Sequence, residues 1–448
     1  MIFIIVLLIF FTTIFCGENI ELTSNITLWF VIIILIYNVL KDRYISLISM
    51  FIFGFIYIYF KEFLNDIPTL YGEWGEKNVN DGYFVIMFSF LSLICGYFLK
   101  DYVRKFNRKK VIVKPNANSD FRLNLIKSKS SFFIINILLV LIIFIGNMVL
   151  IIDGLTKGRP NAFKYGLLSN LSYALSIIAI INFNIYYKQF FARYNVIKVF
   201  IYTFPIFVLL LASGTRFLLL YGIIALISHY FYNLTNPKIF KMLLFLIVFG
   251  LAFNFVLKSR NDGFLNSSVT NNLISPKDEM SLNQKVVQYF TTEGMLRNAA
   301  MITDYTNNHD YTYGRSIGFL TYFWVPREIW HDKPTQLDHW LIRKYTNEYD
   351  DSGHSTASGF MGELYMDFGP YFILPILAVI GWFMSSLNFK YYLNRENFTY
   401  ISVILNGSVL AWIFFSVRSI LTSTFIFLFI YLSAYLINKY FKKWGILN

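Results

Sequence analysis

The sequence predicts an all-α polytopic integral membrane protein with about twelve transmembrane helices. Of its 448 residues, 56% are hydrophobic and only 15% are charged, which lies outside the range of ordinary soluble domains. Apolar runs of roughly 15 to 22 residues recur along the chain, each about long enough to cross a hydrocarbon core as a helix. Lys and Arg cluster at the ends of these runs, as expected for loops that border a bilayer.

The predicted spanning segments can be read directly from the apolar runs. They lie at residues 2–16, 26–40, 44–60, 83–99, 131–152, 167–187, 198–213, 217–232, 240–257, 366–387, 400–416 and 419–437. The first run lacks a basic stretch before it and a small-residue cleavage site after it, so we interpret it as an uncleaved helix. Cys16 and Cys95 are the two cysteines, too few for a disulfide framework or a cysteine metal site.

The distribution of basic residues predicts the topology. With the N-terminus in the cytoplasm, the inner segments hold 22 Lys and Arg residues and the five short outer segments hold 7. Both termini are then cytoplasmic, residues 100–130 form a basic cytoplasmic loop, and residues 258–365 form a large extracytoplasmic loop between the ninth and tenth helices. We expect residues 1–448 to form a single polytopic membrane domain, with the active site in the large loop.

The net charge of +13 does not indicate nucleic acid, because the basic residues mark the ends of apolar runs. The predicted partner is the lipid bilayer. Residues 100–130 are interpreted either as a flexible linker near anionic lipid headgroups or as a topology signal without further function.

The loop 258–365 carries the residue types that chemistry would need. It holds several arginines, namely Arg260, Arg297, Arg315, Arg327 and Arg343. Its aromatic residues suit stacking on sugar faces, although each could instead sit at the membrane interface. These aromatic residues are Tyr305, Tyr311, Tyr313, Trp324, Trp330 and Trp340.

Two short turns place arginine at the predicted outer membrane surface. Arg216 ends Ser-Gly-Thr-Arg between the seventh and eighth helices, and Arg418 lies in Ser-Val-Arg-Ser between the eleventh and twelfth. An arginine at this depth either reaches up to the interface or meets an anion, and its planar fork suits phosphate oxygens.

Two titratable residues are candidates for acid–base chemistry. Glu363, in Gly-Glu-Leu-Tyr365, begins the tenth helix, where it either complements the helix dipole or acts as a general base. His354 is a second candidate, and a solvated loop histidine is the alternative. Asp367 is a weaker candidate than Glu363.

No cofactor or metal is predicted. His331, Asp332, Asp338 and His339 match no strong zinc spacing. The sequence also contains no GxxxxGK[ST], HExxH or GxSxG pattern, and neither early outer loop holds Asp-x-Asp. ATP-driven and metal-dependent chemistry therefore lose support.

Three stretches resemble the Wzy-type polymerases of O-antigen or oligosaccharide repeat units. They are Tyr313-Gly-Arg-Ser-Ile, Phe323-Trp-Val-Pro-Arg-Glu-Ile-Trp-His-Asp-Lys-Pro334 and Ser358-Gly-Phe-Met-Gly-Glu-Leu-Tyr-Met-Asp-Phe-Gly369. The resemblance covers roughly residues 311–370 and the turn at Arg216, and elsewhere it extends only to hydropathy. His331 departs from the Trp-Pro-x-Lys-Pro pattern associated with the family.

The resemblance implies a metal-independent membrane glycosyltransferase of GT-C-like architecture in the bacterial inner membrane. Such an enzyme transfers a glycan from its undecaprenyl pyrophosphate carrier onto an incoming lipid-linked repeat unit at the outer face. A chain-length regulator and a flippase are implied partners. On this interpretation Glu363 is the base and His354 the alternative. The implied substrate-binding residues are Arg216, Arg327, Arg260, Arg315, Arg418, Tyr365 and Trp324.

Two other functions remain open. An O-antigen ligase-like glycosyltransferase would share the lipid pyrophosphate donor and the large outer loop. A lipid-linked oligosaccharide flippase or other transporter should instead carry charges within several helices and have short loops. The Gly-Glu-Leu-Tyr365 stretch favours the polymerase over the ligase, and the nearly charge-free helix centres and the long outer loop favour it over a transporter.

Overall fold

The computed structural model describes a helical chain. It covers residues 20–42, 44–63, 67–107, 125–156, 166–191, 196–213, 216–228, 294–322, 359–389 and 399–448, with single positions between 325 and 344. Within these ranges there is no β-strand, and an isolated bridge pairs Ile126 with Leu447. The described residues therefore confirm the predicted helical class.

Five of the described helices are long and apolar enough to cross a membrane. They are Ile20–Leu40, Glu76–Arg104, Lys129–Gly146, Gly359–Asn388 and Ser423–Lys443. Shorter apolar helices cover Leu47–Tyr59, Val196–Ala212, Phe217–Ile227 and Tyr400–Ser416. The chain is a multi-pass membrane protein. The total of about twelve spans stays a prediction, and the expected spans at 2–16 and 240–257 lie outside the described residues.

The chain divides into two compact units. Unit 1 comprises residues 1–114, 290–393 and 413–423, and unit 2 comprises residues 115–289, 394–412 and 424–448. The prediction of a single polytopic domain, with its two named loops, stays a prediction.

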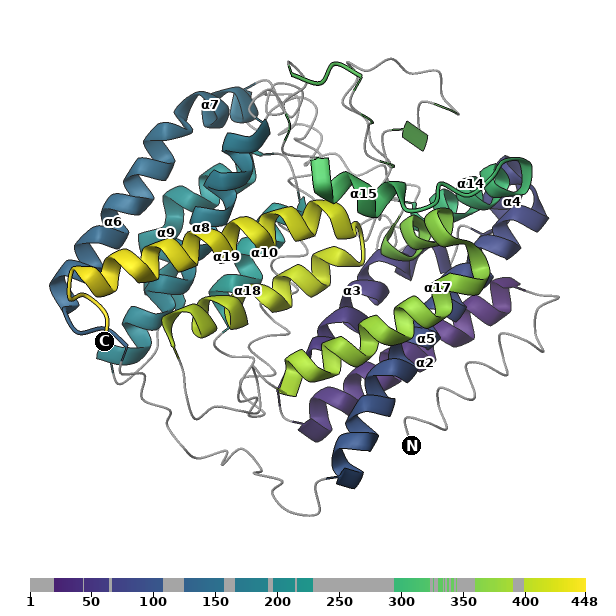
Figure 1. Cartoon of the computed structure of the whole chain (residues 1–448), viewed down its shortest axis with the longest axis horizontal. Helices are drawn as coiled ribbons and strands as arrows, with labels where there is room; N and C mark the ends of the chain where they lie inside the picture. Colours follow the sequence, from purple (N-terminus) through teal and green to yellow (C-terminus); the bar gives the residue numbers. More distant parts are fainter. Residues whose placement is uncertain are drawn as a thin grey trace, which may run out of the picture. The chain divides into compact units, whose positions relative to one another are not determined.

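Unit 1 contains long membrane helices and short helices at one end of them (Figure 1). The long helices are α2 (Ile20–Asp42), α5 (Glu76–Asn107) and α17 (Gly359–Asn388), and a shorter apolar helix is α3 (Leu47–Lys61). The short ones are α4 (Ile67–Trp74), α14 (Met295–Asn308) and α15 (Arg315–Tyr322). Both α4 and α14 contact α5, and α15 contacts α17.

Among the described helices of unit 1, α5 and α17 make the most extensive contact. A Cβ added at Gly96 would overlap the backbone of Ala378, and one added at Gly381 would overlap the carbonyl of Leu93. Small residues allow such backbone approach, which is a common basis of helix association in membranes. The short helices α4, α14 and α15 contact this tightly packed pair.

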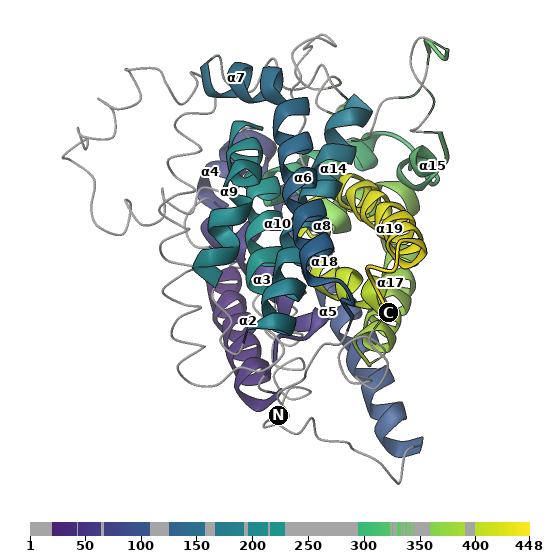
Figure 2. The ribbon, with the colours of Figure 1, turned by 90° about the vertical axis from the view of Figure 1, so that its left-hand side faces the viewer.

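Unit 2 is built around a bundle in which neighbouring helices lie side by side (Figure 2). Its helices are α6 (Lys129–Gly146), α7 (Met148–Thr156), α8 (Gly166–Phe190), α9 (Val196–Ala212) and α10 (Arg216–Ile227). It also holds most of α18 (Tyr400–Ser416) and α19 (Ile420–Lys443). The apolar run predicted as one span at 131–152 is two helices, because the chain turns at Asn147.

Neutral polar side chains join three helices inside unit 2. The Asn182 amide donates to the side-chain oxygen of Asn136 at 2.7 Å and accepts from the Tyr400 hydroxyl at 2.8 Å. Asn136 and Asn182 are buried, as is Tyr400. Because unpaired polar groups are costly in an apolar interior, this network fixes how α6, α8 and α18 meet.

Candidate active site

Helix α14 belongs to the predicted outer loop and is held against α5. The Asn78 amide donates to the Asp304 carboxylate at 2.9 Å, and the Thr303 hydroxyl donates to the backbone carbonyl of Asn78 at 2.8 Å. One turn further, a Cβ added at Gly82 would come within 2.9 Å of the Ala300 nitrogen. A glycine at this position therefore allows the two backbones to meet.

The N-terminus of α14 is capped by a side chain from another helix. Glu62, at the end of α3, accepts hydrogen bonds from the backbone N–H of Leu296 at 2.9 and 3.0 Å and from that of Arg297 at 3.2 Å. Only 2% of Glu62 is exposed. A carboxylate at this point satisfies N–H groups that have no partner within the helix and complements the positive end of its dipole.

A left-handed turn leads the chain into α15. Tyr313 and Gly314 have φ values of 47° and 86°, and α15 begins at the next residue, Arg315. Glycine adopts this conformation without steric cost, which explains the Tyr-Gly-Arg-Ser stretch seen in the sequence. The turn sets the direction of the first residue of α15.

Asp367 of α17 caps the N-terminus of α15. It is fully buried and accepts hydrogen bonds from the Thr312 hydroxyl at 2.6 Å and from the Ser316 N–H at 2.9 Å. The backbone N–H of Thr312 donates to the carbonyl of Met366 at 2.9 Å. Two of the stretches that carry the resemblance, around 313–317 and 358–369, therefore contact one another.

Gly369 makes room for the segment between α14 and α15. Its φ of 70° interrupts the regular helix immediately before Pro370. A Cβ at this position would lie 2.8 Å from the Tyr311 ring, so a side chain would displace that tyrosine. The Tyr311 ring also meets the Tyr365 ring edge to face, with 6.1 Å between centroids.

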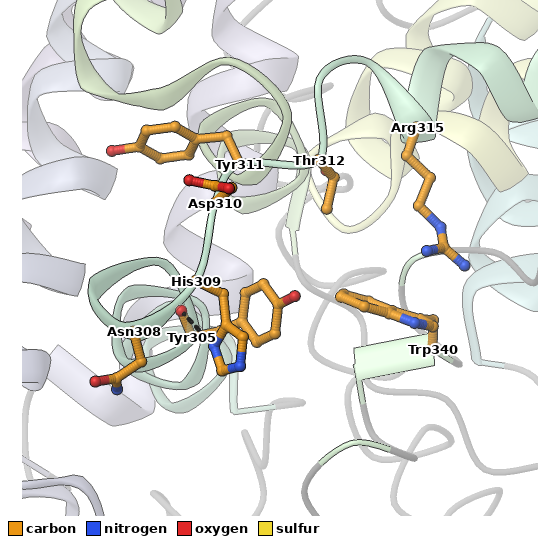
Figure 3. A pocket seen from close by; sticks show the side chains of 8 residues that line it. All are labelled: Tyr305, Asn308, His309, Asp310, Tyr311, Thr312, Arg315 and Trp340. Atoms are coloured by element: carbon orange, nitrogen blue, oxygen red, sulfur yellow. Dashed lines mark hydrogen bonds between the residues drawn. The ribbon is translucent and has the colours of Figure 1, made fainter.

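These elements surround an open cavity of about 590 Å³ (Figure 3). It is lined by Tyr305, Asn308, His309, Asp310, Tyr311, Thr312, Arg315 and Trp340. The guanidinium of Arg315 lies over the Trp340 ring, 4.6 Å from its centroid, and the Tyr305 ring meets Trp340 at 5.2 Å. On its other side, Tyr305 stacks with the His309 ring at 4.4 Å. The cavity thus combines aromatic rings, one cation and short polar side chains.

Among the described residues, Arg315 does not form an ion pair. Its Nε is buried and has no hydrogen-bond partner within the part of the chain that the structure describes. Burial raises the pKa of the nearby Tyr322 hydroxyl, Arg315 lowers it and the Asp367 carboxylate raises it. The guanidinium of Arg315 therefore lies at the cavity wall without an ion pair among the described residues, and a guanidinium in this position suits an anion or a sugar oxygen.

A comparison with protein families shows to which family this helical membrane protein belongs. The family model described as O-antigen polysaccharide polymerase Wzy matches residues 1–444. The chain belongs to this family. No curated protein and no solved structure matches the chain. The family match agrees with the resemblance found in the sequence, and neither the ligase nor the transporter is favoured.

The structure locates several of the residues predicted for the polymerase reaction. Arg315 lines the cavity, and Tyr365 is mostly buried beneath it, against Tyr311. Glu363 is fully buried on α17, one turn before Asp367, and is not among the residues that line the cavity. Arg418 is partly exposed in the turn after α18. The roles of all four predicted residues stay predictions.

The remaining predicted residues lie in unit 2 or outside the described residues. Arg216 is the first residue of α10 and belongs to unit 2. Arg260, Arg327, Trp324 and His354 lie outside the described residues. Within the described ranges, no three His, Cys, Asp or Glu side chains are close enough together to hold a metal ion. The absence of a metal requirement stays a prediction.

Sequence reasoning missed Asn308, His309, Asp310 and Thr312 as cavity residues. They form a short polar stretch before the left-handed turn, and such stretches resemble ordinary loop residues. Three aromatic residues predicted to suit sugars, Tyr305, Tyr311 and Trp340, do line the cavity. In the sequence, the polar residues beside these aromatic residues were the signal that could have identified the site.

Proposed function

We propose that this cavity is where the polymerase binds the reacting end of its lipid-linked glycan. The substrate is a growing chain on undecaprenyl pyrophosphate, and the acceptor is a hydroxyl of an incoming lipid-linked repeat unit. The bond from the sugar anomeric carbon to the pyrophosphate oxygen breaks, and a bond to the acceptor oxygen forms. The acceptor proton passes to a base, and undecaprenyl pyrophosphate leaves.

The observation that carries this proposal is the Arg315 guanidinium at the wall of an aromatic cavity, stacked on the Trp340 ring at 4.6 Å. Negative charge develops on the pyrophosphate oxygens as the sugar departs, and a guanidinium held in a fixed orientation stabilises that charge. Stacking on Trp340 fixes the plane of the guanidinium, so less side-chain freedom is lost when the anion binds.

The remaining lining residues suit the sugar part of the substrate. Rings such as Tyr305 and Trp340 offer apolar surfaces to sugar C–H groups, while Asn308 and Thr312 offer short polar side chains to hydroxyl groups. This combination of a few placed polar groups with aromatic surface is typical of small-ligand sites.

For the proton acceptor, we propose Asp310, the carboxylate among the lining residues. A general base has to come within hydrogen-bond distance of the acceptor hydroxyl, roughly 2.6 to 3.2 Å. Glu363, the base predicted from the sequence, is enclosed by protein and would need a rearrangement to reach a sugar. His354 remains a further alternative. Comparing Asp310→Asn with Glu363→Gln in one assay separates the first two.

The proposed membrane and orientation of the protein rest on the distribution of Lys and Arg along the sequence and not on the cavity. We propose that the protein lies in the bacterial inner membrane with both termini in the cytoplasm, so that α14 and α15 face outward. A flippase would then supply the units, and a chain-length regulator would act beside the polymerase. We retain Arg216, Arg260, Arg327 and Arg418 as further pyrophosphate ligands, and Trp324 and Tyr365 as further substrate-binding residues.

The test is polymer laddering on a gel, in a host that lacks its own polymerase and supplies the cognate lipid-linked repeat unit. At matched membrane levels, we expect Arg315→Ala to lower polymer yield by on the order of a hundredfold, because a fixed charge that stabilises the transition state is lost. Arg315→Lys should restore little, since an ammonium lacks the planar fork.

The matched control is Arg297→Ala. Arg297 is on α14 but is half exposed, pairs with Glu73 at 2.9 Å and does not line the cavity. Its variant should give a ladder close to that of the unaltered protein. A full ladder from Arg315→Ala would contradict the proposal. For the unaltered protein, single capped units alone would indicate ligase activity, and a lack of lipid-linked units outside would indicate transport.

A further inference from the structure

We infer that Asp367 is a positioning residue, which holds Arg315 over the cavity and does not itself take part in proton transfer. This inference rests on the proposed function of the cavity. Acidic residues at the start of the tenth predicted helix are natural candidates for a base, and Asp367 is one of them. Its contacts assign it a different role.

Both carboxylate oxygens of Asp367 are engaged with the chain that leads into α15. One oxygen accepts from the Thr312 hydroxyl at 2.6 Å, and the other accepts from the Ser316 N–H at 2.9 Å. The first oxygen also lies 3.3 Å from the same Ser316 nitrogen. With 0% of Asp367 exposed, no oxygen of this carboxylate faces a substrate.

These contacts bracket Arg315 in the sequence. Thr312 and Ser316 lie on either side of the left-handed turn at Tyr313 and Gly314, and Arg315 is the first residue of α15. Fixing both sides of the turn fixes where the Arg315 side chain begins. Backbone movement at this point would shift the guanidinium from the Trp340 ring.

Asp367 also leaves the guanidinium available. Among the described residues, Asp367 and Arg315 do not form an ion pair, although both influence the Tyr322 hydroxyl. A direct pair would neutralise Arg315 and occupy the donors that a phosphate needs. The carboxylate instead caps the helix that carries the arginine, so it contributes order without competing for the ligand.

The chemistry of the contacts makes asparagine a discriminating replacement. Asparagine can accept from the Ser316 N–H through its oxygen and donate to the Thr312 hydroxyl through its amide nitrogen. The Thr312 hydroxyl can then donate to the Met366 carbonyl, which lies 3.2 Å away. Asp367→Asn therefore preserves the cap but cannot accept a proton as a base, whereas Asp367→Ala removes both capabilities.

The experiment measures laddering by Asp367→Asn and Asp367→Ala, and the affinity of each purified variant in nanodiscs for undecaprenyl pyrophosphate as the probe. We expect Asp367→Asn to stay within about threefold of the unaltered protein in both measurements, because the cap remains. Asp367→Ala should weaken probe binding and laddering by on the order of a hundredfold, because a small displacement of a binding group has a large effect.

A double variant separates positioning from general structural damage. If Asp367 acts through Arg315, adding Asp367→Ala to Arg315→Ala should weaken probe binding no further, since coupled residues are not additive. Additive losses would overturn the inference. So would an Asp367→Asn variant as inactive as Asp367→Ala, which would restore Asp367 as a candidate base. If Arg315→Ala itself left probe binding unchanged, the proposed function of the cavity would be the part that failed.

Discussion

The two units differ in the kind of polar group that they bury. Among the described residues, the buried acidic side chains are Glu62, Glu363 and Asp367, and all three belong to unit 1. The buried polar side chains of unit 2 are neutral, for example Asn136 and Asn182. Ionisable groups are costly inside membrane proteins, so their confinement to one unit points to the unit that carries the chemistry.

The acidic groups of unit 1 connect membrane helices to the helices of the predicted outer loop. Glu62 of α3 caps α14, and Asp367 of α17 caps α15. Each cap accepts hydrogen bonds from backbone N–H groups at the start of a helix. Without the cap, these groups would be buried without a partner. The membrane part of unit 1 thereby fixes the two helices whose residues line much of the cavity. A site placed on short helices can be ordered in this way without a separate folded domain.

The neutral groups of unit 2 instead connect membrane helices to one another. Asn182 links α8 to α6 through Asn136 and to α18 through Tyr400, at 2.7 and 2.8 Å. Hydrogen bonds of this kind between membrane helices are worth about 1 kcal/mol each. They favour assembly of the bundle, and nothing in this network requires a charge. The comparison predicts different consequences when each kind of link is removed.

The largest effect is expected from Glu62→Ala. Its loss would leave the N–H groups of Leu296 and Arg297 without their carboxylate acceptor, and each unsatisfied buried group costs about 1–3 kcal/mol. We expect α14 to loosen and polymer yield per molecule to fall by on the order of a hundredfold. Laddering at matched membrane levels measures the yield.

Limited proteolysis supplies the second measurement for Glu62→Ala, because a loosened α14 should be cleaved faster than in the unaltered protein. Lys77→Ala is the control, since Lys77 is exposed on the neighbouring α5 and contributes no cap. A variant that keeps both its ladder and its resistance to protease would show that the Glu62 contacts do not order the site.

A smaller and different effect is expected from Asn182→Leu in unit 2. This change removes two hydrogen bonds and leaves the buried Asn136 oxygen and Tyr400 hydroxyl without this partner, so we expect a loss of about 2–4 kcal/mol of stability. Thermal unfolding of the purified protein should shift to lower temperature. Polymer yield, corrected for the amount of protein in the membrane, should remain within about twofold, because both capping residues belong to unit 1.

The results for Asn182→Leu and Glu62→Ala together test whether the two units have different roles. If Asn182→Leu abolished the ladder of correctly assembled protein, the chemistry would depend on unit 2 as much as on unit 1. The division of roles between the two units would then be wrong.

Within the described ranges, most predicted spans coincide with apolar helices, because a long apolar run has few alternatives in a bilayer. Hydropathy placed one span at 83–99, whereas α5 extends over Glu76–Asn107. The additional residues are mostly polar and continue the helix beyond the apolar run, where Asn78 meets α14. Hydropathy also missed the turn at Asn147, which interrupts an apolar run without changing its composition.

The candidate site could be predicted only in part. Arg315 was singled out because it lies in a stretch that resembles the family and because a guanidinium suits phosphate oxygens, and the aromatic residues were singled out because of their number. Asp310 was missed because an acidic residue in a loop has no distinctive pattern. The role of Asp367 was not visible, because its partner Ser316 lies 51 positions away and helix capping between separate segments leaves no periodic signal.

The most direct test of the central claim asks whether the substrate enters this cavity. A photo-crosslinking side chain would be placed at Asn308, an exposed residue that lines the cavity, and for comparison at Glu76, an exposed residue of α5 that does not line it. Membranes holding each variant would be irradiated with radiolabelled lipid-linked repeat units. We predict label on the protein altered at position 308, competed by unlabelled undecaprenyl pyrophosphate, and little label at position 76. Equal labelling at both positions, or labelling at 76 alone, would contradict the account.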